Sequence, residues 1–450
     1  MSLLEKYDVP GPRYTSYPTV PYWNGKPSID EWKSNLESNF LSANKKGISL
    51  YLHLPFCEEY CTFCACNKVI TKNHNVEKPY LDALAQEWEM YLSIFPDRPK
   101  IQEIYLGGGT PTFFSPEHLT QLFEFLGKNA DILNSATISV EVNPMKVSYE
   151  QLKALRNKGV NRISLGIQDS NKKVQEAINR LQPNKTVVEV MNWISDLGFK
   201  ETNFDLIYGL PFQTTSSIID TIKLVEKLQP SRIAFYSYAH VPWKKNAQRL
   251  FTENDLPTGS GKWDLFNAGK KHLEQIGYES IGMDHFALPD DSLAKAHQSG
   301  NLHRNFMGYT TTDSKWLIGL GASSISETRD LYVQNEKNAY TYQKKIAQGN
   351  FTFTNGTKLT DTDKIVQRHI KALMCQYKTT FNDSEFEQNL YKQAKQDLAE
   401  MEKDNLLVFS DNRLSVTESG ENFVRNICMS FDQYLNNSDN IKEKQFSKTI

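Results

Sequence analysis

The sequence predicts an α/β fold: an incomplete (β/α)6-type barrel with an N-terminal arm and a small, mainly helical, winged-helix-like C-terminal domain. Short apolar segments, many of them β-branched, alternate with longer amphipathic segments between residues 48 and 239, which is typical of βα units on a parallel sheet. Six such segments are clear, too few for a closed barrel of eight strands. After residue 355 the alternation ends, and helical patterns with one hairpin replace it.

The first part of the chain, residues 1–46, opens with an arm rich in Pro and Tyr and continues into a helix, where Ser28 and Glu31 form a capping box. The barrel domain is expected over residues 47–355. Helices over 79–92 and 115–129 lie between its strands. The expected strands are 48–54, 101–107, 136–142, 162–168, 203–209 and 232–239, with 279–286 as a candidate seventh.

Residues 356–450 are expected to form the C-terminal domain. The hairpin is predicted over 406–417, where Asp-Asn supplies the turn, and residues 436–445 read as a polar, mobile tail. Helices plus a hairpin resemble a winged-helix domain, but no basic face is concentrated here, which favours a structural or lid role over DNA binding. The helices are predicted over 361–377, 383–404 and 420–435.

The overall charge and hydropathy restrict the class of protein. The formal net charge of −2 argues against general electrostatic attraction to nucleic acid or to an anionic membrane. The N-terminal sequence has no basic segment followed by an apolar one, and no apolar run has membrane-spanning length. We therefore expect a cytoplasmic protein with reduced thiols, in which a disulfide is a poor explanation for clustered cysteines. A monomer is a separate expectation that does not follow from these features.

Four of the six cysteines fall within ten positions of FCEEYCTFCACNK (56–68), as Cys57, Cys61, Cys64 and Cys66. A zinc site usually draws its thiolates from two separated pairs, so a single loop fits zinc poorly. Three cysteines spaced x3 and x2 can instead bind three corners of a 4Fe–4S cluster and leave the fourth iron open for a substrate. Cys66, two residues beyond Cys64, is not placed to reach the fourth corner.

A series of residues, most of them polar or glycine, stands on or at the ends of successive predicted strands. In a barrel of parallel strands these ends meet at one mouth, where functional groups gather. Ordinary turn residues could explain any one of them, but explain the whole series poorly. They are Tyr51, Gly107 to Thr110, Glu141, Gln168, Asp205 and Ala239.

The Cys57-x3-Cys61-x2-Cys64 loop after a first strand resembles the radical S-adenosylmethionine (SAM) superfamily. With Cys66 included, LPFCEEYCTFCACNK is similar to the loop of the oxygen-independent coproporphyrinogen III dehydrogenases. The likeness runs along almost the whole chain. It is carried by GPRYTSYPT (11–19), YLGGGTPT (105–112), SVEVNP (139–144), GIQD (166–169), DLIYGLP (205–211), YAHVP (238–242), IGMDHFA (281–287), HRNF-GYTT (303–312) and RNICM-FD (425–432).

This resemblance implies one 4Fe–4S cluster held by Cys57, Cys61 and Cys64, with its open iron bound by SAM, and a catalytic role for Cys66. It also implies two SAM molecules per chain. The residues matched to the first are Tyr51, Gly108, Glu141 and Ile325. Those matched to the second are Phe63, Gly109, Thr110, Gln168, Arg180, Asp205 and Ala239.

The implied reaction is the anaerobic oxidative decarboxylation of two propionates of coproporphyrinogen III to vinyl groups, which gives protoporphyrinogen IX in haem biosynthesis. The implied partner is a low-potential electron donor of the flavodoxin or ferredoxin type. The alternative is a haem chaperone of the same superfamily. Such chaperones typically lack the cysteine at position 66 and an arm like GPRYTSYPT, and this chain has both.

Several matched residues keep a second explanation. Phe63 suits stacking on an adenine or simple apolar cover for the cluster, and Arg180 suits a carboxylate contact or an exposed position on a helix. Arg13 and Arg304 are candidates for the substrate carboxylates, or for structural salt bridges. Met307 stands where the family has a glutamine, so any polar contact from that position is in doubt.

Overall fold

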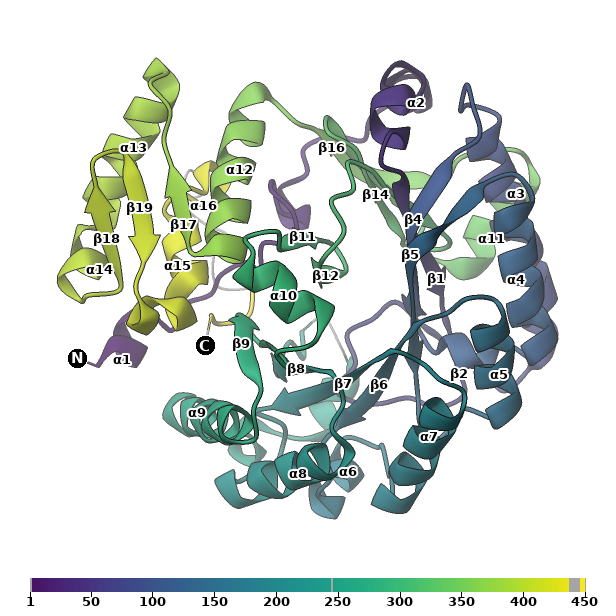
Figure 1. Cartoon of the computed structure of the whole chain (residues 1–450), viewed down its shortest axis with the longest axis horizontal. Coiled ribbons are helices and arrows are strands. Elements are labelled where there is room, and N and C mark those ends of the chain that lie inside the picture. Colours follow the sequence, from purple (N-terminus) through teal and green to yellow (C-terminus); the bar gives the residue numbers. More distant parts are fainter. Residues whose placement is uncertain (1, 244–245, 437–445, 450) are drawn as a thin grey trace.

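The computed structural model describes residues 2–243, 246–436 and 446–449, and its main feature is a twelve-stranded sheet (Figure 1). The expected tail (436–445) lies almost entirely outside these residues. In sheet order the strands are β16 (Phe353–Lys358), β15 (Leu331–Asn335), β14 (Ile325–Glu327), β13 (Leu317–Leu320), β1 (Ile48–Leu54), β4 (Lys100–Gly108), β5 (Asp131–Val142), β6 (Arg162–Gln168), β7 (Glu201–Tyr208), β8 (Arg232–Ser237), β10 (His285–Ala287) and β9 (Glu279–Gly282).

The strands from β13 to β8 run parallel, and they curve into an open barrel with helices on the outside. Their side chains are largely buried, because helices cover the outer face of the sheet and the inner face lines the interior of the barrel. The predicted fold class is confirmed, as are the six predicted strands. The covering helices are α2 (Ile29–Asn44), α3 (Glu77–Leu92), α4 (Pro116–Lys128), α5 (Tyr149–Asn157), α6 (Lys172–Ala177), α7 (Asn184–Asp196), α8 (Thr215–Leu228), α9 (Gly259–Gln275) and α11 (Ala339–Ala347).

The prediction of one further strand over 279–286 was wrong. The chain forms β9 and β10 there, and these pair antiparallel with each other. Met283, at a φ of 47°, lies in the turn that reverses the chain, and β10 then runs antiparallel to β8. The sequence pattern also missed β13 to β16, because these strands are short and are separated by Gly and Ser residues.

The helix starts behave as the sequence predicts. Ser28 caps α2 in a capping box with Glu31, and Ser115 accepts a hydrogen bond from the His118 N–H at the start of α4. Among the residues that the structure describes, no helix combines the length and the apolar character needed to cross a membrane.

The C-terminal domain contains the predicted hairpin, and a short third strand, β17, pairs beside it. The predicted single helix over 383–404 was wrong, because it breaks at Leu398 into α13 and α14. The division at residues 46 and 355 stays a prediction, and its second boundary falls inside β16. The elements are α12 (Asp361–Gln376), β17 (Lys378–Thr380), α13 (Glu385–Asp397), α14 (Ala399–Lys403), β18 (Leu407–Ser410), β19 (Arg413–Val416), α15 (Val424–Met429) and α16 (Gln433–Asn436).

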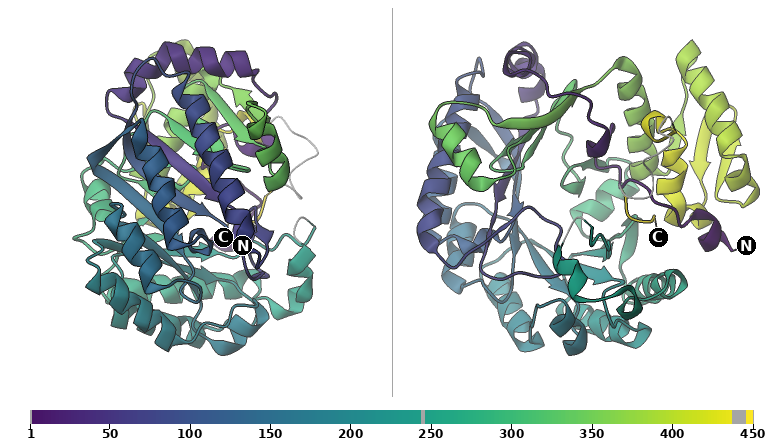
Figure 2. Two further views of the ribbon diagram at one scale, coloured as in Figure 1. Left: turned by 90° about the vertical axis from the view of Figure 1, so that its right-hand side faces the viewer. Right: turned by 180° about the vertical axis from the view of Figure 1, so that it is seen from behind.

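The N-terminal arm passes between the C-terminal domain and the barrel, as Figure 2 shows from behind. The buried Arg425 of α15 holds it by donating to the carbonyl oxygens of Gly11, Pro12 and Thr449. Residues 447–449 run alongside the arm, where Pro10 and Lys448 form a bridge. The arm is therefore fixed at the open side of the barrel.

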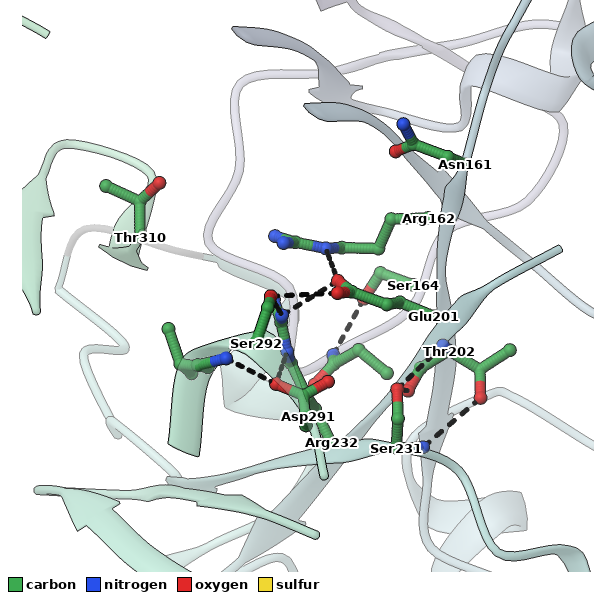
Figure 3. A network of polar contacts seen from close by, with 12 residues as sticks. Asn161, Arg162, Ser164, Glu201, Thr202, Ser231, Arg232, Asp291, Ser292 and Thr310 are labelled. Atoms are coloured by element: carbon green, nitrogen blue, oxygen red, sulfur yellow. Dashed lines mark hydrogen bonds and ion pairs between the residues drawn. The ribbon is translucent and has the colours of Figure 1, made fainter. Parts of the chain in front are cut away.

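A charge network lies at the amino-terminal ends of β6, β7 and β8, where these strands begin (Figure 3). Arg232 donates to Asp291 at 2.6 Å, and to Glu201 and Ser292 at 2.7 Å each. Arg162 donates to the same Glu201 oxygen at 3.0 Å. Because this network lies at the amino-terminal strand ends, we assign it to stability rather than to chemistry.

Candidate active site

A cavity of about 270 Å³ lies at the carboxyl ends of the parallel strands. The expected site residues line it, with three exceptions: Tyr51, Ala239 and Ile325. The lining residues among those expected are Cys57, Cys61, Phe63, Cys64, Cys66, Gly108, Gly109, Thr110, Glu141, Gln168, Arg180 and Asp205.

The cysteine loop is closed at its base, so that all four thiols face this cavity. Its first strand, β2 (Phe56–Cys57), pairs in parallel with β3 (Val69–Ile70). The Val69 N–H donates to the Pro55 carbonyl at 2.8 Å, which brings the end of the loop back to β1. The four cysteines of the loop form no disulfide in the structure.

The thiols of this loop are a donor set that suits an iron–sulfur cluster. Among the described residues, no three His, Cys, Asp or Glu side chains converge on a point suited to one metal ion. A 4Fe–4S cluster needs no such convergence, because each thiolate binds a different iron. Three thiols from one loop around one cavity therefore match the donor set of a cluster.

The segment after α6 anchors the cysteine loop. Thr62 donates its N–H to the Ile178 carbonyl at 3.1 Å and its hydroxyl to the Ala177 carbonyl at 3.2 Å. Asn179 donates to the Tyr60 carbonyl at 2.8 Å. Arg180 lies 3.7 Å from the Cys61 sulfur, so its guanidinium points into the site and not to the surface.

The glycines after β4 are required by close packing of the chain. A Cβ atom on Gly109 would lie 2.6 Å from the Pro55 backbone, and one on Gly108, whose φ is +114°, would lie 2.7 Å from the His53 ring. The glycines therefore let the loop fit closely against β1 and the residues that follow it. Thr110 then reaches the Cys57 sulfur at 3.3 Å.

Two half-buried carboxyl groups, Glu141 and Asp205, line the cavity, and each accepts hydrogen bonds from neighbouring polar groups. Glu141 accepts hydrogen bonds from the Tyr105 hydroxyl at 3.0 Å and the Gly108 N–H at 3.2 Å. Burial, together with nearby Asp205, raises the pKa of Glu141 to about 7. Both carboxyl groups can accept hydrogen bonds from hydroxyl or amino groups of a ligand.

Asp205 accepts a hydrogen bond from Ser164 at 3.0 Å and one from Asn203 at 2.8 Å. Burial raises the pKa of Asp205 as well. Neither Ser164 nor Asn203 is among the site residues predicted from the sequence. Asn203 could have been found, because residues two apart on a strand share a face.

Of the three expected residues outside the lining, Tyr51 and Ala239 lie close to lining residues along the chain, whereas Ile325 lies on a segment distant in sequence. Tyr51 is on β1, and its hydroxyl is 3.0 Å from the His53 Nδ1 atom. Ala239 lies two residues beyond the end of β8. Ile325 begins β14 and packs against the apolar cluster of Trp23 and Tyr332.

The two candidate arginines are held by contacts away from the cavity lining. Arg13 is 2.6 Å from Asp284, which favours the structural explanation for it. Burial alone would raise the pKa of Asp284, but Arg13 and His285 hold it well below its usual range. Arg304 donates to the Arg13 carbonyl at 3.2 Å and lies over the Tyr309 ring.

Comparison with known proteins identifies the family. The family model described as the radical SAM superfamily matches residues 51–225. An oxygen-independent coproporphyrinogen III oxidase from Salmonella typhimurium is 40% identical over 459 residues, which covers 100% of this chain and 98% of that relative. One from Escherichia coli (strain K12) is 38% identical with the same coverage.

The structure agrees with this relationship. The solved structure of coproporphyrinogen III oxidase from Escherichia coli, described as a radical SAM enzyme, has a TM-score of 0.89 and 37% sequence identity to this chain. The match covers 94% of this chain and 98% of that one. The chain therefore belongs to the family of oxygen-independent coproporphyrinogen III oxidases, within the radical SAM superfamily.

Proposed function

We propose that this protein converts coproporphyrinogen III to protoporphyrinogen IX without O2, by oxidative decarboxylation of two propionate side chains. The observation that carries the proposal is full-length similarity to oxidases of that name, at 40% identity over 98% of the relative's length. The four-cysteine loop on the cavity supports it independently. The haem chaperone alternative is not favoured by these relatives.

We infer that Cys57, Cys61 and Cys64 hold one 4Fe–4S cluster and that two SAM molecules bind at the mouth of the barrel, where this cavity lies. When bound, the reduced cluster and SAM supply a 5′-deoxyadenosyl radical that removes a hydrogen atom from the propionate. The chain's own residues bind and orient the nucleosides through Glu141 and Asp205, whose oxygens accept hydrogen bonds from hydroxyl groups.

The protein must also shelter the reacting carbon. Phe63 is half-buried beside the cavity and packs with Ile178 and Tyr238, which excludes water from this side of the cysteine loop. Each propionate would then lose one hydrogen atom to the radical, CO2, and one electron to an electron acceptor, and become a vinyl group. We propose that a low-potential donor of the flavodoxin or ferredoxin type supplies the electron that reduces the cluster. We also propose that the protein catalyses the reaction as a monomer in the reducing cytoplasm.

The test is an anaerobic assay with coproporphyrinogen III, SAM and a low-potential reductant. We expect CO2, protoporphyrinogen IX, and about two molecules of SAM consumed per porphyrinogen, since two hydrogen atoms are removed. A wild-type protein that cleaves SAM, never decarboxylates the porphyrinogen and binds haem tightly would instead establish the chaperone function.

A further inference from the structure

Gln248 is a fully buried glutamine in the short 3₁₀ helix Asn246–Leu250, outside the segment that matches the superfamily model. Its side-chain oxygen accepts a hydrogen bond from the Val241 N–H at 2.6 Å. Its side-chain nitrogen donates to the Ala239 carbonyl at 3.2 Å and to the Phe63 carbonyl at 3.3 Å. A primary amide suits this place, because the partners need one acceptor and two donor hydrogens.

The two carbonyls belong to segments far apart in sequence. Phe63 lies in the cysteine loop, between two of the proposed cluster ligands, and Ala239 lies just beyond β8. Both are residues matched above to the second SAM molecule. Gln248 therefore joins, through one side chain, two positions that are expected to contact the same nucleoside.

The two segments differ in how many other bonds hold them. The cysteine loop is held independently by Thr62 and Asn179, through the bonds to residues 177 and 178 and to the Tyr60 carbonyl. Among the described residues, the backbone of residues 239–241 makes hydrogen bonds only to Gln248. Loss of the amide should therefore release residues 239–241 and leave the cysteine loop in place.

We propose that Gln248 is a positioning residue that holds Ala239 and Phe63 at the spacing required by the second SAM molecule. The inference rests on the proposed function, and specifically on two SAM molecules per chain. It assigns Gln248 no contact with substrate or cluster.

The test replaces the amide by a thioether of similar length, Gln248→Met, in anaerobically reconstituted protein. We expect iron and sulfide content to stay at the wild-type level, while the second SAM molecule binds about tenfold more weakly or not at all, since all three side-chain hydrogen bonds of Gln248 are lost. The measurement is SAM bound per chain by equilibrium dialysis, which needs no turnover.

Two further variants make the result specific. Gln248→Glu keeps an acceptor for the Val241 N–H, but it places a carboxylate oxygen next to the carbonyl oxygens of Ala239 and Phe63. It should therefore lose the second SAM as well. This variant keeps the test valid if Gln248→Met does not fold. Asn161→Leu is the matched control. It removes an amide that binds the Ala136 carbonyl and the Ile138 N–H at the opposite end of the barrel, and it should leave SAM binding unchanged.

The outcomes separate this inference from the proposed function. Wild-type affinity for two SAM molecules in both Gln248 variants would overturn this inference and leave the proposed function standing. Loss of the iron–sulfur cluster together with the second SAM in these variants would have the same consequence. A wild-type protein that binds a single SAM would overturn the proposed stoichiometry first and the inference with it. Loss of the second SAM in the Asn161→Leu control would show a general effect of destabilisation and would also overturn the inference.

Discussion

Glu87 on α3 is a fully buried carboxyl group that holds the turn after β13, and it leads to a prediction about pH. It accepts hydrogen bonds from the Gly321 N–H at 2.8 Å and from Asn335 and the Tyr342 hydroxyl at 2.6 Å each. Burial raises the pKa of Glu87 from 4.5 to about 7, although these three donors oppose the change.

The direction and size of the effect follow from this pKa. A carboxyl group with a raised pKa binds its proton more tightly in the folded state, so its contribution to stability is full below pH 4.5 and is lost as the pH rises through 7. Between pH 5 and pH 8 the loss is about 2.5 kcal/mol. For 450 residues, with about 2.1 cal/mol/K of unfolding entropy per residue, this corresponds to about 3 °C in Tm.

The assay compares the Tm of wild type and Glu87→Gln from pH 5 to pH 8. The amide does not titrate, so the Tm of the wild type should fall by about 3 °C relative to the variant as the pH rises. Glu124→Gln, which removes an exposed carboxylate from α4, is the matched control and should show no such trend. A difference between wild type and Glu87→Gln that stays constant over this range would refute the reasoning.

Three further predictions concern the cluster, a nucleoside contact and the charge network. Reconstituted protein should hold about four irons and four sulfides per chain. The variants Cys57→Ala, Cys61→Ala and Cys64→Ala should each lose this iron and sulfide. Cys66→Ala should keep its iron but lose turnover, and equal iron loss there would contradict a three-cysteine ligand set. Asp205→Ala should lower turnover with iron content unchanged, and iron loss would contradict a role in holding a nucleoside. Arg232→Ala should lower the free energy of unfolding by about 3–5 kcal/mol in denaturant, because Asp291 stays buried without its partner. A decrease in the free energy of unfolding of less than about 1 kcal/mol would contradict this prediction and show that Arg232 and Asp291 interact as weakly as an exposed ion pair.

The sequence alone predicts those features of this protein that depend on residues close to one another in the chain. Apolar periodicity predicted the six barrel strands, because a strand and a helix bury side chains at different spacings. The spacing of Cys57, Cys61 and Cys64 predicted a cluster, because the ligands come from one short loop. Polar residues at successive strand ends predicted a common site, since parallel strands bring these ends to one mouth.

Only the tertiary structure decided how distant segments support this site. Gln248 and Phe63 are 185 residues apart, and no local pattern indicates that their segments meet. Arg13 is a candidate for a substrate carboxylate or for a structural salt bridge, and only the fold shows that it lies against Asp284. Segments such as 279–286 were misjudged for the same reason. The partner of a short strand or a buried polar side chain is set by packing of the whole chain, whereas periodicity and spacing describe only its neighbours in sequence.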